Sequence, residues 1–213
     1  RPYLSLNWPH YEKLRQLHDA HQRAKGASVG NRALLHDRLF CALACVEALG
    51  GAGYQAALPP SAFRVLRRRL EVTLECFASP LNCTLPAYCS LLPHTDAPFG
   101  SRGSFFDFWP DSGSFEMNPP FVPEVMSAAV EHAEALLDAS TGPMSFAIFV
   151  PAWKEVACWR QLERSRWVRG PLHVIPAREH VFSDGSQHRA ASQFRPASFD
   201  TAVAFLQNEA GAR

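Results

Sequence analysis

The chain has 213 residues, of which 47% are hydrophobic, and a formal net charge of +1. This length and composition favour one globular domain, or one domain with a helical extension. The small net charge excludes a globally basic nucleic-acid surface, so any RNA contact must use local arginine clusters such as residues 64–69 and 160–169, which equally fit solvated helix faces.

The first half of the chain is predicted to be mainly helical. Leu14 and Leu17 share one side of a polar segment, and a later apolar stripe ends at Gly50-Gly51, a helix C-cap signal. In chain order we expect helices at 9–25, at 32–49 and from residue 61, a strand at 71–77, a weak helix at 85–92 and a loop at 93–103.

The second half alternates strands with helices. Apolar residues recur at helical spacing through 122–139, and 145–150 is a fully apolar run that Pro151 ends. In chain order we expect extended chain at 104–109, a strand at 114–117, a helix at 122–139, a strand at 145–150, an arginine-rich helix at 156–167, a strand at 172–175, a polar loop at 179–196 and a strand at 201–206.

The six cysteines include no Cys-x-x-Cys pair, and the nine histidines show no metal-site spacing, so we expect reduced thiols and no metal. Cys41 and Cys45 lie one helical turn apart in an apolar stripe and are predicted to be small buried residues. With no secretory leader and no apolar run long enough to span a bilayer, no membrane partner is expected. Because residue 1 is Arg1 and not Met, we expect a piece or a processed form of a longer protein.

Strands that alternate with helices indicate an α/β domain with a parallel-rich sheet covered on both faces. We expect a helical extension over residues 1–58 and the α/β core over 59–213. In such sheets, ligands bind beyond the carboxyl ends of the strands near the switch point. The loops at 77–82, 96–103 and 118–121 are therefore candidates for one site that holds a cofactor beside a substrate.

The segment Asn118-Pro119-Pro120-Phe121 directly follows a predicted strand. The prolines fix φ at roughly −65° and remove two backbone donors, but their carbonyls remain. The Asn118 side-chain oxygen and the Pro119 carbonyl can accept from one exocyclic amine while Phe121 stacks on its ring. Two such acceptors favour a more nucleophilic nitrogen. The segment matches the Asn/Asp-Pro-Pro-aromatic motif of S-adenosylmethionine-dependent amino-methyltransferases; an ordinary Pro-Pro turn that ends a strand is the alternative.

Six blocks of sequence extend this likeness over most of the chain. They are FASPLNC at 77–83, FGSRG at 99–103, GSFEMNPPF at 113–121, SFAIFVPAW at 145–153, GSQH at 185–188 and TAVAFLQN at 201–208. In this order they resemble the phosphorylated-CTD-interacting factor family, which consists of cap-specific adenosine N6-methyltransferases. The resemblance runs from about residue 32 to residue 208.

The resemblance implies a Rossmann-like class I methyltransferase sheet with an N-terminal helical extension. It implies S-adenosylmethionine as the cofactor and 2′-O-methyladenosine at the first transcribed position of capped mRNA as the substrate. The capped mRNA 5′ end would be the partner, with a link to RNA polymerase II through regions absent from this chain, because no tryptophan pair has WW-domain spacing here. We expect a nuclear protein, with the cytoplasm as the alternative.

The resemblance implies roles for residues 118–121 and for the loops at 77–82 and 99–101, and the roles of Asp96, Trp153, Gln187 and His188 are expected from the residues themselves. The catalytic set is Asn118, Pro119, Pro120 and Phe121. The expected cofactor-binding set is Phe77, Ala78, Ser79, Pro80, Asn82, Asp96, Phe99, Gly100, Ser101 and Asn118. The expected substrate-binding set is Phe121, Trp153, Gln187 and His188.

Several of these residues also have plainer interpretations. Asp96 fits either a bond to a cofactor ribose or a turn before Pro98. Trp153 fits either a base-stacking wall or the core, and His188 fits either a substrate contact or a surface histidine. Two other functions remain open, namely an adenine N6-methyltransferase acting on DNA or internal RNA, and an inactive methyltransferase fold that serves as a binding module.

Overall fold

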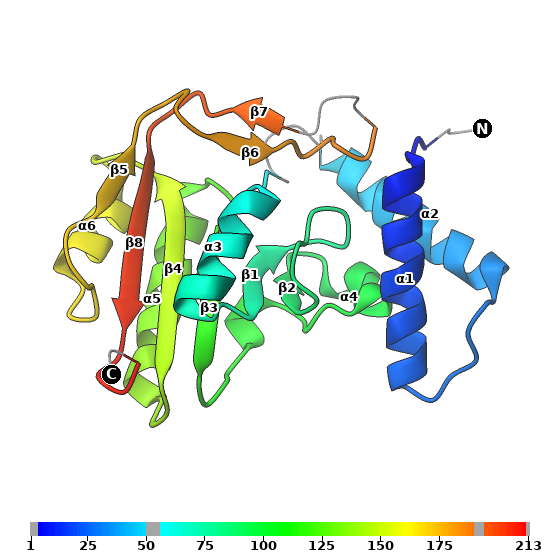
Figure 1. Cartoon of the computed structure of the whole chain (residues 1–213), viewed down its shortest axis with the longest axis horizontal. Coiled ribbons are helices and arrows are strands. Elements are labelled where there is room, and N and C mark those ends of the chain that lie inside the picture. Colours follow the sequence, from blue (N-terminus) through cyan, green and yellow to red (C-terminus); the bar gives the residue numbers. More distant parts are fainter. Residues whose placement is uncertain (1–3, 50–55, 190–193, 212–213) are drawn as a thin grey trace.

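The computed structural model describes residues 4–49, 56–189 and 194–211, which form an α/β fold with a six-stranded sheet (Figure 1). The elements in chain order are α1 (Trp8–Ala24), α2 (Arg32–Ala48), α3 (Pro60–Leu70), β1 (Leu74–Ala78), β2 (Tyr88–Ser90), α4 (Pro93–Asp96), η1 (Ala97–Phe99), η2 (Phe105–Asp107), β3 (Gly113–Met117), α5 (Pro123–Ala139), β4 (Met144–Pro151), α6 (Ala157–Arg164), β5 (His173–Ile175), β6 (Val181–Ser183), β7 (Phe194–Pro196) and β8 (Thr201–Gln207).

The sheet has the strand order β2-β1-β3-β4-β8-β5. The first four strands run parallel, whereas β8 is antiparallel to both β4 and β5. The expected α/β fold is confirmed, and the sheet is mixed. The carboxyl ends of the parallel strands share one edge, and the separate β6–β7 hairpin lies over that edge (Figure 1).

Helices cover both faces of the sheet (Figure 1). Helix α5 starts at Pro123, where the missing N–H costs no helical bond, and its apolar stripe is fully buried against the strands and α6. On the other face, α3 packs Phe63 and Leu66 against β4 and β8. Full burial of such a side chain contributes about 1.5–3 kcal/mol to the stability of the fold. This packing holds the helices on the two faces of the sheet and so determines which edge of the sheet stays open.

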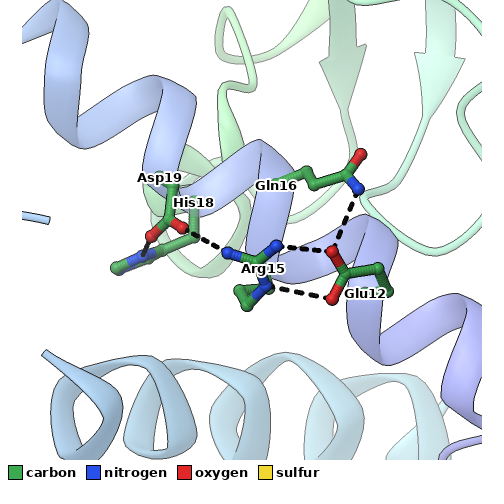
Figure 2. A network of polar contacts seen from close by, with 5 residues as sticks. All are labelled: Glu12, Arg15, Gln16, His18 and Asp19. Carbon is green, nitrogen blue, oxygen red and sulfur yellow. Dashed lines mark hydrogen bonds and ion pairs between the residues drawn. The ribbon is translucent and has the colours of Figure 1, made fainter. Parts of the chain in front are cut away.

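The N-terminal helices α1 and α2 pack on each other beyond the β2 edge (Figure 1). Their shared core takes in Leu81 and Phe99 from the loops of the sheet. On α1, Arg15 bridges Glu12 and Asp19 at i,i+3 and i,i+4 spacing, and Gln16 adds a bond to Glu12 (Figure 2). These exposed pairs support the helix only weakly.

Four sequence predictions about local structure were wrong. Residues 85–92, expected as a weak helix, contain strand β2. The strand was missed because three buried residues are too few to show a strand period. Residues 104–109 contain the 3₁₀ turn η2, and 93–103 contain α4 and η1. Residues 179–196, expected as a polar loop, contribute the β6–β7 hairpin, whose strands expose many side chains and so lack an apolar pattern.

Smaller corrections concern helix ends and cysteines. The first strand starts after residue 71, because Glu71 has a φ of 52° and caps α3 in the left-handed region. Cys41, expected to be buried, is exposed on α2, although all six thiols are free. The Gly50-Gly51 signal lies outside the described residues. Within them, no helix combines the length and hydropathy needed to cross a bilayer.

Candidate active site

The strand order of the sheet reverses between β1 and β3. The chain passes from β1 to β2 on one side and later to β3 on the other side of β1. In open α/β sheets, ligands bind beyond the carboxyl ends of the strands at such a switch point. Ser79 follows β1 there and Asn118 follows β3. The predicted loops at 77–82 and 118–121 therefore lie side by side.

Asn118 presents a fixed, unused acceptor at this point. Its side chain is only 7% exposed, and its Nδ2 donates to the Ala56 carbonyl oxygen over 3.2 Å. Its Oδ1 is buried and has no hydrogen-bond partner among the described residues. Turning the amide over would place oxygen against the Ala56 carbonyl, so the acceptor orientation is set by Ala56. Buried acceptors are rarely left unpaired, which points to a ligand donor.

The two prolines leave a second acceptor beside Asn118. The Pro120 carbonyl accepts from the Val122 N–H over 2.7 Å, which closes the turn into α5. No described backbone N–H donates to the Pro119 carbonyl. The half-buried ring of Phe121 follows. The segment thus combines an amide oxygen, a backbone oxygen and an aromatic face.

A small cavity of about 20 Å³ lies where β1 and β2 end. Its walls come from the first and second predicted loops and from α2, and they include Ala78, Ser79, Pro80, Asp96, Ala42 and Val46. The structure therefore brings together four of the residues expected to face the cofactor. Asn82 does not line the cavity, but its side-chain oxygen accepts from the backbone N–H and the hydroxyl of Ser79 and fixes the turn.

Asp96 is the acidic side chain of this cavity. It is 4% exposed, and burial raises its pKa to about 7, against the opposing effect of bonds from Ser90 and Thr95. No cationic side chain forms an ion pair with it among the described residues. Asp96 ends the short helix α4 that follows β2, and a buried carboxyl group placed there can accept from ribose hydroxyls.

The remaining residues of the second loop hold its shape. Phe99 is fully buried against α1, and its carbonyl accepts from the Tyr88 hydroxyl over 3.1 Å. Gly100 has a φ of 97°, which only glycine adopts without strain. The Ser101 and Ser90 hydroxyls are 2.7 Å apart. Phe77 turns to the opposite side, where its ring lies 5.2 Å from that of Phe105.

A second cavity, of about 140 Å³, lies next to Asn118. Ala56, which holds the Asn118 amide, lines it together with Phe121, Phe182 and Phe199. The Phe121 ring is 5.3 Å from Phe199 and 6.0 Å from Phe182, in edge-to-face contacts. Sequence reasoning missed Ala56, Phe182 and Phe199, because their contribution depends on the hairpin that was expected to be a loop.

Of the predicted substrate residues, Trp153 lies beside this aromatic cavity, whereas Gln187 and His188 contact the start of α1. The Trp153 ring packs 6.4 Å from Phe199. The backbone carbonyl of Gln187 accepts from the Asn7 side chain, and that of His188 accepts from the Asn7 N–H. The His188 side chain is 0% exposed, lies 6.4 Å from the His10 ring and has both nitrogens unpaired. Burial lowers its pKa, so it is neutral near pH 7.

Two buried glutamates lie under the site, and sequence reasoning missed them. Glu75 and Glu116 are register partners on β1 and β3, so they share one face of the sheet. Glu75 accepts from the Thr84 and Leu85 backbone N–H groups. Burial raises the pKa of Glu75 to about 7, and burial and Glu75 together raise that of Glu116 well above its ordinary value. Acidic residues inside predicted strands were the available signal.

The arginine clusters flank the sheet at separate places. Arg64, Arg67, Arg68 and Arg69 are exposed on α3. The second cluster lies on and after α6, beside the β5 edge and away from the switch point (Figure 1). There Arg166 forms an ion pair with Asp138. Neither cluster lines either of the two cavities described above.

The matches with known proteins agree with this geometry. A family model described as "Phosphorylated CTD interacting factor 1 WW domain" matches residues 13–185. The chain belongs to this family. Two curated relatives, from Homo sapiens and Mus musculus, are each 48% identical to it over 165 residues and are both named mRNA (2′-O-methyladenosine-N(6)-)-methyltransferase. The alignment covers 76% of this chain and 23% of each relative, so the chain spans about a quarter of the length of these relatives.

The family match confirms the resemblance carried by the sequence blocks. The matched range extends from α1 to the residues after β6 and contains both predicted ligand loops and the Asn118 strand. Although the family description mentions a WW domain, these residues fold as helices and a mixed sheet. The residues that carry the family match are therefore those that form the α/β fold and the candidate site.

Proposed function

We propose that the chain is an S-adenosylmethionine-dependent methyltransferase that modifies N6 of cap-adjacent 2′-O-methyladenosine in mRNA. The observation that carries this proposal is the Asn118 amide, whose donor side is held by Ala56 and whose buried oxygen has no partner within the described chain. The relatives at 48% identity are named for this reaction, which supports the choice of substrate.

The fold supports a Rossmann-like class I sheet. Strands β2, β1, β3 and β4 run parallel and reverse order at the β1–β3 switch point, as in nucleotide-binding α/β domains. The single antiparallel strand, β8, lies between β4 and β5. We assign residues 59–213 to this domain and 1–58 to a helical extension, whose helices pack with Leu81 and Phe99.

The donor set of the first cavity fits a nucleoside cofactor. Asp96 supplies an acceptor for ribose hydroxyls, and Ser79 and Pro80 allow close approach to the end of β1. Asn82, Phe99, Gly100 and Ser101 support these two loops, and Phe77 supports β1 from the opposite face. A cavity of about 20 Å³ is smaller than a nucleoside, so cofactor binding there requires its lining residues to rearrange. When bound, S-adenosylmethionine supplies an electrophilic methyl group.

The catalytic segment positions and polarises the amine. Asn118 Oδ1 and the Pro119 carbonyl accept its two hydrogens, which draws nitrogen lone-pair density out of the ring and stabilises positive charge as the methyl arrives. Phe121 stacks on the base, and Trp153 closes the aromatic wall behind Phe199. The proton leaves to water after transfer, so no strong base is needed. His188 and Gln187 would act by holding the loop beside the base.

The partner we propose is the capped 5′ end of mRNA. A terminal adenosine enters a pocket without leaving a duplex, which suits a chain of net charge +1. The family description, which refers to a phosphorylated CTD, supports a link to RNA polymerase II through regions outside this chain. Nuclear action follows from this substrate, with cytoplasmic mRNA as the alternative setting.

Methyl transfer from labelled S-adenosylmethionine tests the proposal. We expect initial rates to be highest on capped RNA that begins with 2′-O-methyladenosine, lower on uncapped RNA and lowest on duplex DNA. Faster methylation of duplex DNA or internal adenosine would assign the site to another amine substrate. Cofactor binding without transfer to any of them would identify an inactive binding module.

A further inference from the structure

The mouth of the aromatic cavity carries a charged pair that the catalytic chemistry does not use. The cavity is lined by Asp184 and Arg195 in addition to its phenylalanines. Arg195 Nη2 lies 2.8 Å from Asp184 Oδ2, across the β6–β7 hairpin. The Arg195 side chain is 62% exposed, whereas that of Asp184 is 11% exposed. The guanidinium therefore faces solvent while it is anchored to a mostly buried carboxylate.

Asp184 is itself held firmly. Its Oδ1 accepts from the Ser186 N–H over 2.8 Å and from the Ser186 hydroxyl over 2.6 Å. Although burial raises its pKa, these bonds and the Arg195 charge outweigh burial and keep the pKa below its ordinary value. The carboxylate stays ionised and satisfied, so it fixes the guanidinium instead of competing for a ligand.

Arg195 retains donors for an anion. A guanidinium has five N–H donors, and the ion pair engages Nη2. No other acceptor in the described part of the chain ion-pairs with it. Its fork matches phosphate geometry, for which arginine is the preferred side chain. Among the residues that line the cavity, Arg195 is the cationic one.

The β6–β7 hairpin is hydrogen-bonded to the segment that holds Asn118. The position of Arg195 relative to the Asn118 oxygen is therefore fixed. Ser183 N–H donates to the Ala57 carbonyl over 2.7 Å, and Ala57 N–H donates back over 3.2 Å. The adjacent Ala56 carbonyl holds Asn118. A nucleotide whose base reaches Asn118 through the aromatic cavity must carry its sugar and phosphate past the hairpin.

We propose that Arg195, oriented by Asp184, binds an RNA backbone phosphate next to the methylated nucleotide. This inference rests on the proposed function, because it takes the base to occupy the aromatic cavity. It places the phosphate contact on the hairpin and away from the arginine clusters of α3 and α6. Arg195 would then be a substrate-binding residue that selects a phosphate-bearing nucleotide over a free nucleoside.

Equilibrium binding of a fluorescein-labelled capped RNA beginning with 2′-O-methyladenosine tests this role over a series of salt concentrations. Arg195→Gln should weaken binding about five- to tenfold at low salt, and the log–log salt slope should fall by about 0.7 for one lost single-strand phosphate contact. Arg195→Lys should keep most of the slope. Asp184→Asn should give a smaller loss, because the guanidinium keeps its charge but loses its anchor.

Arg166→Gln is the matched control. Arg166 is 68% exposed and also pairs with an aspartate, Asp138, but it lies beside the β5 edge. Its loss should leave the affinity and the slope unchanged. Equal slopes for Arg195→Gln and wild type would overturn the proposal. If Arg195→Gln lowers RNA affinity and the salt slope as expected but the wild type transfers no methyl group, the proposed function is wrong and the phosphate contact is supported. If the wild type methylates RNA but Arg195→Gln changes neither affinity nor slope, the phosphate contact is wrong and the proposed function is supported.

Discussion

Replacing Asn118 by alanine removes the acceptor that points into the site and also the 3.2 Å bond to the Ala56 carbonyl. The two losses have different sizes. Removing a preorganised partner of developing charge lowers kcat by about 10²–10³, or about 2.7–4 kcal/mol. Losing one neutral hydrogen bond lowers the free energy of unfolding by only about 1 kcal/mol. We therefore expect a folded variant that still binds the cofactor but transfers methyl groups very slowly.

The assay is single-turnover methyl transfer to capped RNA, with cofactor affinity measured by calorimetry on the same samples. Asn208→Ala is a control for general destabilisation. Asn208 is also buried, accepts from the Met144 N–H and donates to the Gly142 carbonyl, but it lies at the opposite edge of the sheet. That variant should lose stability and keep its kcat. If Asn118→Ala transfers methyl groups within about threefold of the wild-type rate (roughly 0.7 kcal/mol), the assigned role is wrong.

Four further variants, at three positions, test other parts of the site. Phe121→Ala should weaken RNA binding by roughly 1–3 kcal/mol through lost stacking, while Phe121→Tyr should keep substantial activity; equal KM values for both would argue against stacking. Asp96→Asn should weaken cofactor binding about tenfold (about 1.4 kcal/mol) with little change in kcat at saturating cofactor, and an unchanged affinity would remove Asp96 from the cofactor site. Glu116→Gln should flatten the pH dependence of stability. The pKa of Glu116 in the folded protein lies well above its ordinary value of 4.5. The protonated form of Glu116 therefore stabilises the fold at low pH. Above about pH 5, wild type should lose about 1.4 kcal/mol of unfolding free energy per pH unit through this group, and urea unfolding at several pH values would show whether the variant loses that slope.

The sequence predicted those helices and strands whose buried faces leave a clear pattern of apolar residues. Helix α5 and strand β4 were recognisable because apolar residues recur every three to four positions in one and continuously in the other. The direction of β8 was not predictable, because an apolar strand reads the same whether its neighbour runs parallel or antiparallel. The β6–β7 hairpin was missed because its strands are only three residues long and mostly exposed. Val181 and Phe194 face solvent, and Phe182 alone is a buried apolar residue, so no alternating pattern marks the strands.

The candidate site was predictable only where chemistry is local in sequence. Asn118 to Phe121 form one segment, so a motif could indicate an amine site. The orientation of the Asn118 amide depends on Ala56, and the far wall of the aromatic cavity depends on Phe182 and Phe199. These residues are far apart in the chain and chemically unremarkable alone. Only the folded chain shows that they meet.

The domain boundary expected at residue 58 lies next to Ala56 and Ala57, two residues that contact the candidate site. Ala56 accepts from the Asn118 amide and Ala57 pairs with Ser183, so the last residues of the expected helical extension join the end of β3 to the hairpin. At the other end of that extension, Asn7 caps α1 and donates to the carbonyls of Gln187 and His188. The extension thus contacts the hairpin side of the site at both ends. Asn118 and the hairpin that carries Arg195 are therefore both placed by contacts with the residues that precede α1 and α3.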